Sequence, residues 1–458
     1  MKVILISPYD KTPCIGLRTI SSVLKNAGHD VKIVFLPISH QDHFSKENYD
    51  KKTVNDVVRI CKSVDLVGIT LMTNYFVKVA KLTEQLKKRL DVKVVWGGIH
   101  ATSRPEECLE YADIVCIGDG EDAMVEFCEN PERRDVKNLW FKDNGHTIKN
   151  ELRVLRKDID SLPFPDYSLE DHYVLDEGNV KKMSYSLLRK TMSKCGMLGG
   201  LTEYAVFTIR GCPQKCSYCC NSLLKEVYGD KYRMGMMSVE RIIAELEDVV
   251  SKYPFIKHII IEDDIFFMRS LDEIRRFSKE YKERVNLPFR CYACPQDVDE
   301  EKLKLLVSAG LYSIGVGIQS YSQKTLTKCY ERFCSKKQII DCVNLLKKYK
   351  EVRHPIYYVM FDNPYDTFFS MLKTWFFIFR LPADSVCWFP LTFFPNTKLY
   401  KRAKSDGFID NEMREIYLRS WNNWKEIKYH TFLSRILIVT LSLKNKFRLK
   451  KQRRQSSV

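Results

Sequence analysis

Short apolar runs alternate with amphipathic stretches over the first 130 residues. The amphipathic stretches, such as LRTISSVLKNAG and FVKVAKLTEQLKKRL, repeat apolar residues at helical spacing. Between such stretches lie five apolar runs of strand length: KVILIS, VKIVFL, DLVGIT, VKVVWGG and DIVCIG. Strands that alternate with helices are typical of α/β proteins with a parallel sheet. We therefore expect residues 1–130 to form a doubly wound α/β domain.

The turns that follow these strands indicate a ligand site. In a doubly wound sheet, ligands bind at the carboxyl ends of the strands, where the strand order reverses. Glycine there allows close approach of the backbone, and Ser and Thr supply hydroxyl donors. One glycine pair is more often an ordinary strand-to-helix turn, but several such turns on one edge favour a ligand site. The turns are SPYDKTPCIG, TLMTNYF, GGIHAT and GDGEDA.

A connection and a second domain follow. Residues 131–204 contain an Asp-Asn-Gly turn in NLWFKDNGHTIKN, which predicts a β-hairpin, and a proline-containing linker, DIDSLPFPDYSLEDHY. In residues 205–400 a strand–helix unit repeats six times, which falls short of the eight units of a closed barrel. We expect a partial parallel barrel with its active site at the carboxyl ends of the strands. Its strands are AVFTIR, HIII, FRCYACP, YSIGVGIQS, IYYVMF and SVCWFPL.

Charge is concentrated at the C-terminus. The chain has a net charge of +16, and residues 425–458 hold ten Lys/Arg against the single Glu426. We expect residues 401–458 to form a helical extension with a basic tail. A solvated tail is the ordinary interpretation, and peripheral contact with an anionic membrane or an acidic partner is the alternative. No sequence-reading nucleic-acid module is predicted.

Cysteine usage favours a reducing compartment. Sixteen cysteines occur at irregular spacing, and the start MKVILISPYD does not resemble a signal segment. Such thiols stay free or bind metal in the cytoplasm. The apolar run ILIVTLSL is shorter than the roughly 20 residues that span a bilayer. We expect a cytoplasmic protein without a transmembrane helix.

The most informative segment is RGCPQKCSYCCNS, which spaces Cys212, Cys216 and Cys219 as C-x3-C-x2-C. Thiolates favour zinc, copper(I) or iron and sulfide. Structural zinc usually takes four protein ligands from two C-x2-C knuckles, and a second knuckle does not follow at the usual distance. Three cysteines on a 4Fe-4S cluster would leave one iron open to a substrate. The adjacent Cys220 is expected to point away from Cys219 and to be a small buried residue.

A second C-x2-C pair lies on a predicted strand. Cys291 and Cys294 have the spacing of a metal knuckle. Because strand residues mainly form the barrel wall, we interpret both as ordinary wall residues.

The loop RGCPQKCSYC resembles the signature of the radical S-adenosylmethionine (SAM) superfamily, whose C-x3-C-x-aromatic-C loop carries a 4Fe-4S cluster on a partial barrel. The segments GLRTISSVLKNAGHDV, GGIHATSRPEE and GDGEDA resemble the Rossmann-like N-terminal domain of the cobalamin-binding branch. The resemblance covers residues 1–407. It implies three cofactors: the cluster, SAM and cobalamin.

The resemblance assigns roles to residues of the barrel. Cys212, Cys216 and Cys219 would ligate the cluster. The segment IIIEDDIFF would hold the methionine ammonium of SAM, which needs anionic or carbonyl acceptors. It departs from the common Gly-Gly-Glu form, so the carboxylate that makes this contact stays open. The implied SAM residues are Tyr218 for the adenine, Glu262, Asp263 and Asp264 for the ammonium, Gln319 and Ser320 for the ribose, and Arg332 for a carboxylate.

The cobalamin assignments are similar expectations. The D-x-H-x-x-G motif, which supplies a histidine ligand to cobalt in some cobalamin proteins, is absent from the sequence. His100 is a possible substitute, but a hydrogen-bonded histidine is the ordinary interpretation, and we expect no histidine on the lower face of cobalamin. The residues expected at this edge are Ser7, Thr70, Thr73, Gly97, Gly98, His100, Gly118, Gly120 and Glu121.

The resemblance implies a cobalamin-dependent radical SAM methyltransferase. In that class a 5'-deoxyadenosyl radical activates the substrate, and methylcobalamin gives its methyl group to an unactivated carbon or to phosphorus. A radical SAM cyclase or rearrangement enzyme without methyl transfer is the alternative. A radical enzyme that has lost cobalamin and a zinc-stabilised binding protein are minor alternatives.

The expected partners are a small-molecule substrate and an electron donor such as flavodoxin or ferredoxin, with possible membrane contact through the basic tail. Tyr357, Tyr358 and Trp388 are further candidates to face substrate or cobalamin.

Overall fold

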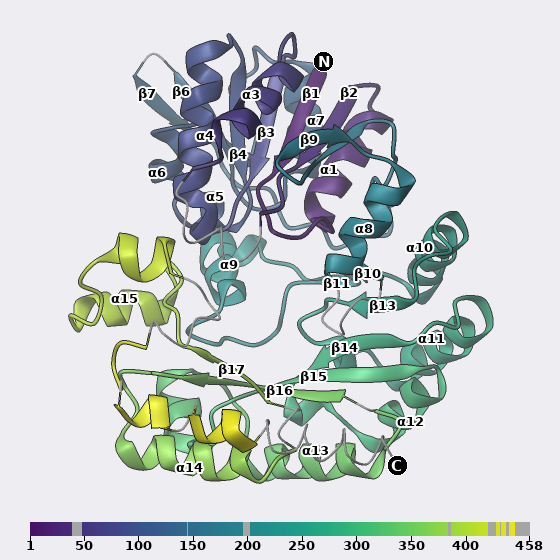
Figure 1. Cartoon of the computed structure of the whole chain (residues 1–458), viewed down its shortest axis with the longest axis vertical. Helices are drawn as coiled ribbons and strands as arrows, with labels where there is room; N and C mark the ends of the chain where they lie inside the picture. Colours follow the sequence, from purple (N-terminus) through teal and green to yellow (C-terminus); the bar gives the residue numbers. More distant parts are fainter. Residues whose placement is uncertain are drawn as a thin grey trace.

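The computed structural model describes residues 1–38, 48–143, 145–195, 202–352, 354–382, 386–419, 427–430, 432–436 and 439–444. An N-terminal α/β domain lies above a barrel-like domain, and the two are joined near α8 and α9 (Figure 1). The predicted basic tail, from residue 445 on, lies outside the described residues.

A nine-stranded sheet forms the core of the N-terminal domain. Its order is β7-β6-β5-β4-β3-β1-β2-β8-β9. Strands β1 to β5 pair in parallel, and β1 lies between β2 and β3, where the strand order reverses. The doubly wound prediction is confirmed. The strands are β1 (Lys2–Ser7), β2 (Asp30–Phe35), β3 (Leu66–Thr70), β4 (Lys93–Gly97), β5 (Ile114–Cys116), β6 (Leu139–Asp143), β7 (His146–Lys149), β8 (His172–Asp176) and β9 (Asn179–Lys182).

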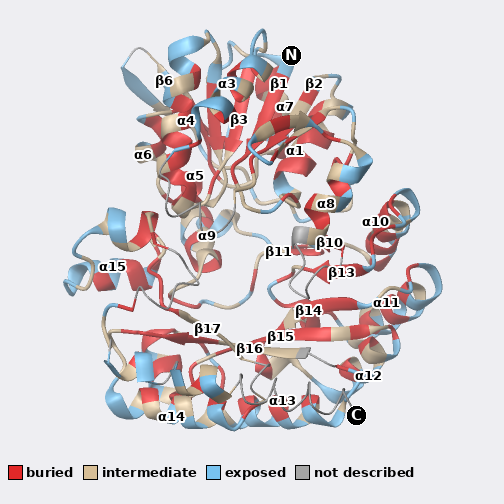
Figure 2. Ribbon diagram, in the orientation of Figure 1, coloured by how far each residue is buried: buried red, intermediate tan, exposed pale blue. Residues whose placement is uncertain are grey.

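Helices cover this sheet as the periodicity predicts. The central strands are buried along nearly their whole length, because helices pack on the sheet (Figure 2). Helix α1, for example, turns Leu17 and Leu24 toward the core. The helices are α1 (Ile15–Asn26), α3 (Lys51–Ile60), α4 (Phe76–Arg89), α5 (Ile99–Ser103), α6 (Pro105–Leu109) and α7 (Glu121–Glu129), with the short η1 (Thr73–Tyr75) before α4.

Residues 131–204 do more than connect the domains. The predicted hairpin is present as β6 and β7, and β6 extends the sheet antiparallel to β5. A second hairpin, β8 and β9, adds to the opposite edge, where β8 pairs in parallel with β2. Its turn holds Glu177 and Gly178 at φ of 51° and 74°, the left-handed geometry of a tight hairpin. Helix α8 (Tyr185–Cys195) then leads to the barrel.

The second domain is a six-stranded parallel sheet in chain order, β10-β13-β14-β15-β16-β17. This confirms the partial barrel. The predicted strand AVFTIR divides in two, because residues 209–210 leave the sheet as β11 and pair antiparallel with β12 (Gly235–Met236). The strands are β10 (Glu203–Val206), β11 (Ile209–Arg210), β13 (His258–Ile261), β14 (Phe289–Ala293), β15 (Leu311–Gln319), β16 (His354–Phe361) and β17 (Val386–Pro390).

Hydroxyl residues cap most helices of the barrel. Ser238, Ser270, Ser335 and Thr367 each accept a hydrogen bond from a backbone N–H in the first turn of the helix that follows. The helices are α9 (Cys220–Tyr228), α10 (Val239–Lys252), α11 (Leu271–Arg284), α12 (Glu300–Ser308), α13 (Lys336–Lys348) and α14 (Phe368–Phe379).

After the barrel the chain returns to the N-terminal domain. Helix α15 (Lys398–Ser405) and the turn η7 (Met413–Tyr417) supply this contact. Arg104 donates to the Tyr400 hydroxyl at 2.5 Å and pairs with Glu412. The Tyr417 hydroxyl donates to Glu107 at 2.6 Å. The predicted C-terminal extension therefore holds the two domains together as well as ending the barrel.

Candidate active site

The three cysteines of the motif share one cavity. Their loop runs from the end of β11 to the start of α9, with Cys212 and Cys216 buried and Cys219 half-buried. All three line a cavity of about 330 Å³ together with residues that follow β13, β14 and β15. The predicted residues Tyr218, Glu262, Asp263, Asp264, Gln319 and Arg332 also line it.

The residues on this wall suit an iron–sulfur cluster. Among the residues that the structure describes, no three His, Cys, Asp or Glu side chains converge as ligands of one metal ion. A 4Fe-4S cluster is a larger group, and cysteine thiolates are its usual ligands. Three thiols on the wall of one cavity suit such a group.

Cys220 differs in part from expectation. It does not line the cavity, but it is half-buried rather than buried as predicted, and its thiol lies within hydrogen-bonding reach of Cys219. This hydrogen bond lowers the pKa of the Cys219 thiol to about 7. The two neighbours do not point apart, because Cys219 is the extended residue before α9 and Cys220 is the first residue of the helix.

Arg332 lies among the sulfur atoms. Its guanidinium donates to Gly317 O at 2.7 Å and lies 3.6 Å from Cys216 Sγ and 3.2 Å from Cys294 Sγ. Cys294, which we interpreted as an ordinary wall residue, thus lines the cavity and packs with Cys212 and Ile265. The C-x2-C spacing with Cys291 marked this residue, but only the barrel closure brings Cys294 to the loop.

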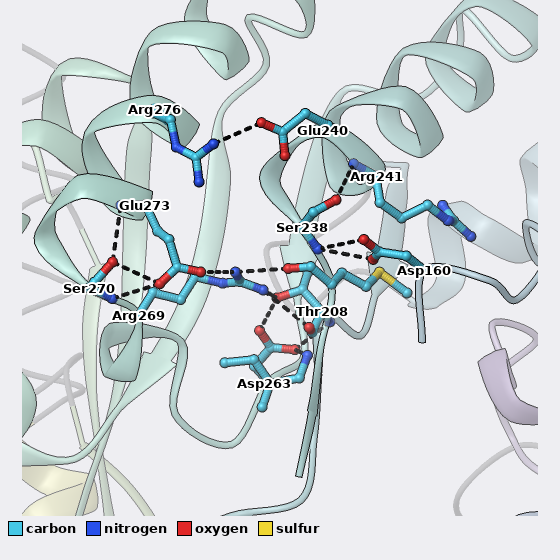
Figure 3. A network of polar contacts seen from close by, with 12 residues as sticks. Asp160, Thr208, Ser238, Glu240, Arg241, Asp263, Arg269, Ser270, Glu273 and Arg276 are labelled. Carbon is cyan, nitrogen blue, oxygen red and sulfur yellow. Dashed lines mark hydrogen bonds and ion pairs between the residues drawn. The ribbon is translucent and has the colours of Figure 1, made fainter. Parts of the chain in front are cut away.

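Asp263 holds the loop that precedes the cysteines. Its carboxylate is fully buried and accepts from the backbone N–H of Thr208 at 2.6 Å and of Ile209 at 2.8 Å, and from the Thr208 hydroxyl (Figure 3). Arg269 donates to Thr208 O and Oγ1 at 3.1 and 3.0 Å. Burial raises the pKa of Asp263 to about 6. Because these donors occupy the carboxylate, Asp263 is a poor candidate to hold the SAM ammonium.

The other two carboxylates differ in their surroundings. Burial raises the pKa of both. Glu262 lies in the field of Arg290 and within reach of the Tyr292 hydroxyl. Asp264 accepts only from Asn221 Nδ2, at 2.7 Å, and among the described residues no cation contributes to its pKa shift. A bound ammonium would supply the positive charge that Asp264 lacks.

Asp264→Asn is therefore expected to weaken SAM binding about tenfold, the worth of one charge-assisted hydrogen bond. Equilibrium dialysis of the cluster-loaded protein with radiolabelled SAM measures this. Glu262→Gln is the matched control and is expected to change the affinity less. A larger loss in Glu262→Gln would assign the ammonium to Glu262 instead.

The side chains of Gln319 and Ser320 point to different sides at the end of β15. Gln319 has φ of 64°, where the pairing of β15 with β16 shifts register. Its buried Oε1 has no hydrogen-bond partner among the described residues, and it faces the cavity. Ser320 is buried on the other side of the strand end, where its hydroxyl pairs with Thr374 at 3.2 Å. The expected ribose contact of Ser320 is therefore not supported, because successive residues turn to opposite faces.

The same cavity contains residues that the motifs did not predict. Asn221, Tyr292 and Phe389 line it. Of the three further candidates, Tyr358 lines the cavity, whereas Tyr357 and Trp388 do not. Arg290 donates to the Tyr358 hydroxyl at 3.0 Å and to Tyr292 from behind the wall. Asn221 lies on α9, whereas the aromatic residues lie on strands, so the sequence could have indicated them only with the register known.

A second cavity, of about 540 Å³, lies at the carboxyl edge of the N-terminal sheet. The predicted residues Thr70, Gly97, Gly98, Gly118, Gly120 and Glu121 line it, together with Tyr9, Arg210 and Tyr228. Asp264 lines both cavities, so the two share a wall.

The glycines of this edge form a cradle. A Cβ on Gly98, which has φ of 96°, would lie 2.8 Å from Leu71 O and Thr70 Oγ1. A Cβ on Gly118 would lie 1.6 Å from the Tyr228 hydroxyl oxygen. These clashes are with the protein itself, so both turns need glycine, and the glycines that line the cavity leave backbone open to a large group such as cobalamin.

Gly98→Ala is expected to weaken cobalamin binding about tenfold, because relieving the contact with Leu71 O must move the turn. Titration of the apo-protein with hydroxocobalamin, followed by absorbance, measures the affinity. Gly28→Ala is the matched control, since Gly28 has φ of 84° but nothing within 4 Å of its added Cβ. Equal losses in the two variants would contradict a role for Gly98 in the cradle.

Three predicted cobalamin residues do not line this cavity, namely Ser7, Thr73 and His100. Ser7 is buried at the end of β1. The imidazole of His100 is fully buried, with Nδ1 3.0 Å from Thr73 Oγ1 and Nε2 3.5 Å from Glu107 Oε2. Burial lowers the pKa of His100. Phe76 and Tyr417 pack against its ring, so His100 belongs to the contact with the C-terminal extension.

Both ends of the cysteine segment contact the turn GDGEDA of the N-terminal domain. Arg210, two residues before Cys212, pairs with Glu121 at 2.7 Å and Asp119 at 3.5 Å. At the end of α9, the Tyr228 hydroxyl accepts from Asp119 N at 3.1 Å. The two candidate cofactor sites are thus held in a fixed relation by direct contacts.

The fold and the two cavities suit an iron–sulfur enzyme that cleaves SAM and carries a second domain for a further cofactor. Comparisons with known proteins agree. Residues 1–128 match the family model of the B12 binding domain, and residues 206–373 match that of the radical SAM superfamily. The chain belongs to the cobalamin-binding branch of the radical SAM superfamily, and its cofactors are a 4Fe-4S cluster, SAM and cobalamin.

Several relatives align over most of the chain. An uncharacterized methyltransferase of Pyrococcus horikoshii is 26% identical over 434 residues, covering 89% of this chain and 84% of the relative. Cytidylyl-2-hydroxyethylphosphonate methyltransferase of Streptomyces wedmorensis is 23% identical and covers 90% of this chain and 83% of its own. The radical SAM methyltransferase TsrM of Kitasatospora setae, solved with cobalamin and a 4Fe-4S cluster, superposes with a TM-score of 0.66 at 17% identity, over 88% of this chain and 75% of that chain. This last likeness shows the fold.

Proposed function

We propose that the protein is a cobalamin-dependent radical SAM methyltransferase that methylates an unactivated carbon or a phosphorus centre of a small molecule. The observation that carries this proposal is the wall shared by the two cavities at Asp264. A substrate bound there would meet both the SAM site and the cobalamin site. When bound, the cluster supplies the electron that cleaves SAM, and cobalamin supplies the methyl group.

The residues of the chain orient these groups. In this proposal Cys212, Cys216 and Cys219 hold the cluster, and Tyr218 lies against the adenine. Asp264 accepts from the ammonium of SAM, and the free Oε1 of Gln319 accepts from a ribose hydroxyl. Arg332, whose Nε has no partner among the described residues, retains donor capacity toward a carboxylate. The aromatic lining, including Tyr292 and Phe389, excludes water from the reaction.

The proposal keeps the division expected from the sequence. Residues 1–130 would bind cobalamin, 131–204 would connect, 205–400 would form the SAM barrel, and 401–458 would form the extension. An electron donor such as flavodoxin or ferredoxin would reduce the cluster. A reducing cytoplasm is the proposed compartment, because the chain has sixteen cysteines at irregular spacing. No helix among the described residues is long and apolar enough to cross a membrane. We propose that the basic tail makes peripheral contact with an anionic membrane.

Transfer of a labelled methyl group tests the function. The reconstituted enzyme is incubated without oxygen with SAM that carries a deuterated methyl group. A reductant and a small-molecule extract of the cells that naturally make this protein are added. We expect deuterium in a new product and 5'-deoxyadenosine in the same sample, and neither with Cys216→Ala. A new product without deuterium, formed together with 5'-deoxyadenosine, would support the cyclase or rearrangement alternative.

A further inference from the structure

Exposed apolar side chains concentrate on one surface of the barrel domain. Of the fifteen large apolar side chains that are exposed among the described residues, eight belong to α14 or to the helical residues 432–436 and 439–444. Phe369 and Phe432 are 71% and 78% exposed. Such a concentration is unusual for a free surface and indicates a docking site. The eight are Phe368, Phe369, Phe376, Phe379, Phe432, Ile436, Val439 and Leu443. We call them the docking face.

Helix α14 is apolar on both sides. Met371 and Ile378 pack inward on the barrel. The outward side carries Phe369, Lys373 and Phe376 at helical spacing, followed by Arg380, all exposed. A helix that is apolar all round is ordinarily buried on all sides. Here the outward side combines aromatic rings with basic side chains, and residues 368–380 contain no acidic residue.

The C-terminal segment extends the same surface. Trp375 Nε1 donates to Thr440 Oγ1 at 3.1 Å, and Lys444 Nζ lies 4.6 Å from the centre of the Phe379 ring, so the two elements are neighbours. Phe432 and Ile436 are one turn apart, as are Val439 and Leu443, and all four are exposed. This surface lies at the end of the molecule away from the N-terminal domain (Figure 1).

The charge of residues 427–458 indicates what binds to the docking face. Residues 427–458 contain nine Lys/Arg and no Asp or Glu, and six of these bases follow the docking face directly, between Lys446 and Arg454. Exposed apolar side chains beside clustered bases are typical of segments that lie in the interface of an anionic bilayer. A protein partner or a second copy would have to match this charge with acidic residues, and the docking face itself has none.

We propose that the docking face inserts into the surface of an anionic membrane, with the basic tail held at the lipid headgroups. This deepens the tail contact proposed above and does not depend on methyl transfer. The apolar side chains supply the area buried in the bilayer, and the bases supply the attraction to anionic lipid. The protein would then lie on the membrane through the barrel, with its N-terminal domain turned away.

Vesicle flotation tests this with the full-length cluster-loaded protein. Vesicles of phosphatidylcholine, with phosphatidylglycerol at about a third of the lipid, are expected to carry the protein, and added salt is expected to reduce the bound fraction. Vesicles of phosphatidylcholine alone are expected to carry little. Equal binding to both kinds of vesicle, or to neither, would overturn the proposal.

Two sets of variants separate the face from the tail. The face variant Phe369→Ser/Phe376→Ser/Phe432→Ser is expected to lower the affinity about tenfold or more. The control Val154→Ser/Tyr185→Ser, at exposed sites outside the docking face, is not expected to lower it. Iron content and circular dichroism show that each variant is folded. A second variant replaces the six bases of residues 446–454 by Gln.

If only the tail variant loses binding, the tail contact stands and the docking face is refuted. Light scattering adds a further test. A wild-type dimer in the absence of lipid that becomes monomeric in the face variant would show that a second copy covers the surface.

Discussion

The Cys216→Ala protein is expected to purify without iron or sulfide while keeping its fold. Cys216 contributes one of three thiols on the cavity wall, and two are too few to hold a 4Fe-4S cluster. The loop itself is set by other contacts: Ser222 Oγ donates to Cys216 O at 2.7 Å, and Ser217 N donates to Tyr330 O at 2.9 Å. Iron and sulfide analysis gives the cluster content, and circular dichroism of the apo-proteins compares the folds.

Two neighbouring cysteines serve as controls. Cys220 hydrogen-bonds Cys219 but does not line the cavity, and Cys294 lines it outside the motif. Both Cys220→Ala and Cys294→Ala are expected to keep most of their iron. A full complement of iron in Cys216→Ala, or its loss in Cys220→Ala, would contradict the assignment of the three ligands.

Asp263→Asn is expected to lower the free energy of unfolding by about 3 kcal/mol. The replacement removes a buried charge that Arg269 balances, and it puts an amide NH2 where Oδ2 now accepts from the Thr208 hydroxyl. The bend that separates β10 from β11, and with it the start of the cysteine loop, depends on these bonds. Urea unfolding of the apo-protein measures the change.

Asp264→Asn is the matched control for this prediction as well. Among the residues that the structure places, Asn221 is the single hydrogen-bond donor to its carboxylate, so the loss of stability is expected to be about 1 kcal/mol or less. We therefore expect different effects from the two adjacent substitutions. Asp263→Asn should lower stability, and Asp264→Asn should lower the affinity for SAM. Similar stabilities of the two variants would show that Asp263 does not anchor the loop.

The architecture was predictable because the spacing of apolar residues within each short segment indicates whether it is a strand or a helix. The runs KVILIS and DLVGIT are buried strands, and the capped, amphipathic stretches are helices. The cysteine spacing predicted the loop at the right place in the barrel. The hairpin of β8 and β9 was missed, because its pairing with β2 joins residues far apart in the chain.

Side-chain direction was not predictable to the same extent. Ser320 and His100 lie in the expected turns but face away from the cavities. For Ser320 one step along the strand end turns the side chain to the other face, whereas His100 lies on α5 and packs against the C-terminal extension. The acidic run of residues 262–264 predicted a SAM contact, but it did not show that the Asp263 carboxylate already accepts hydrogen bonds from Thr208. Cys294 and Tyr292 reach the site only through the closure of the barrel.

The central claim is that one chain holds a cluster and cobalamin on either side of a shared wall. The most direct test is a count of iron, sulfide, cobalt and zinc per chain in protein purified without oxygen from cells supplied with cobalamin. The account predicts about four irons and about one cobalt. Four irons without cobalt would show that the N-terminal domain does not bind cobalamin, and would remove the basis for methyl transfer. Zinc in place of iron would contradict the assignment of both the cluster and the radical reaction.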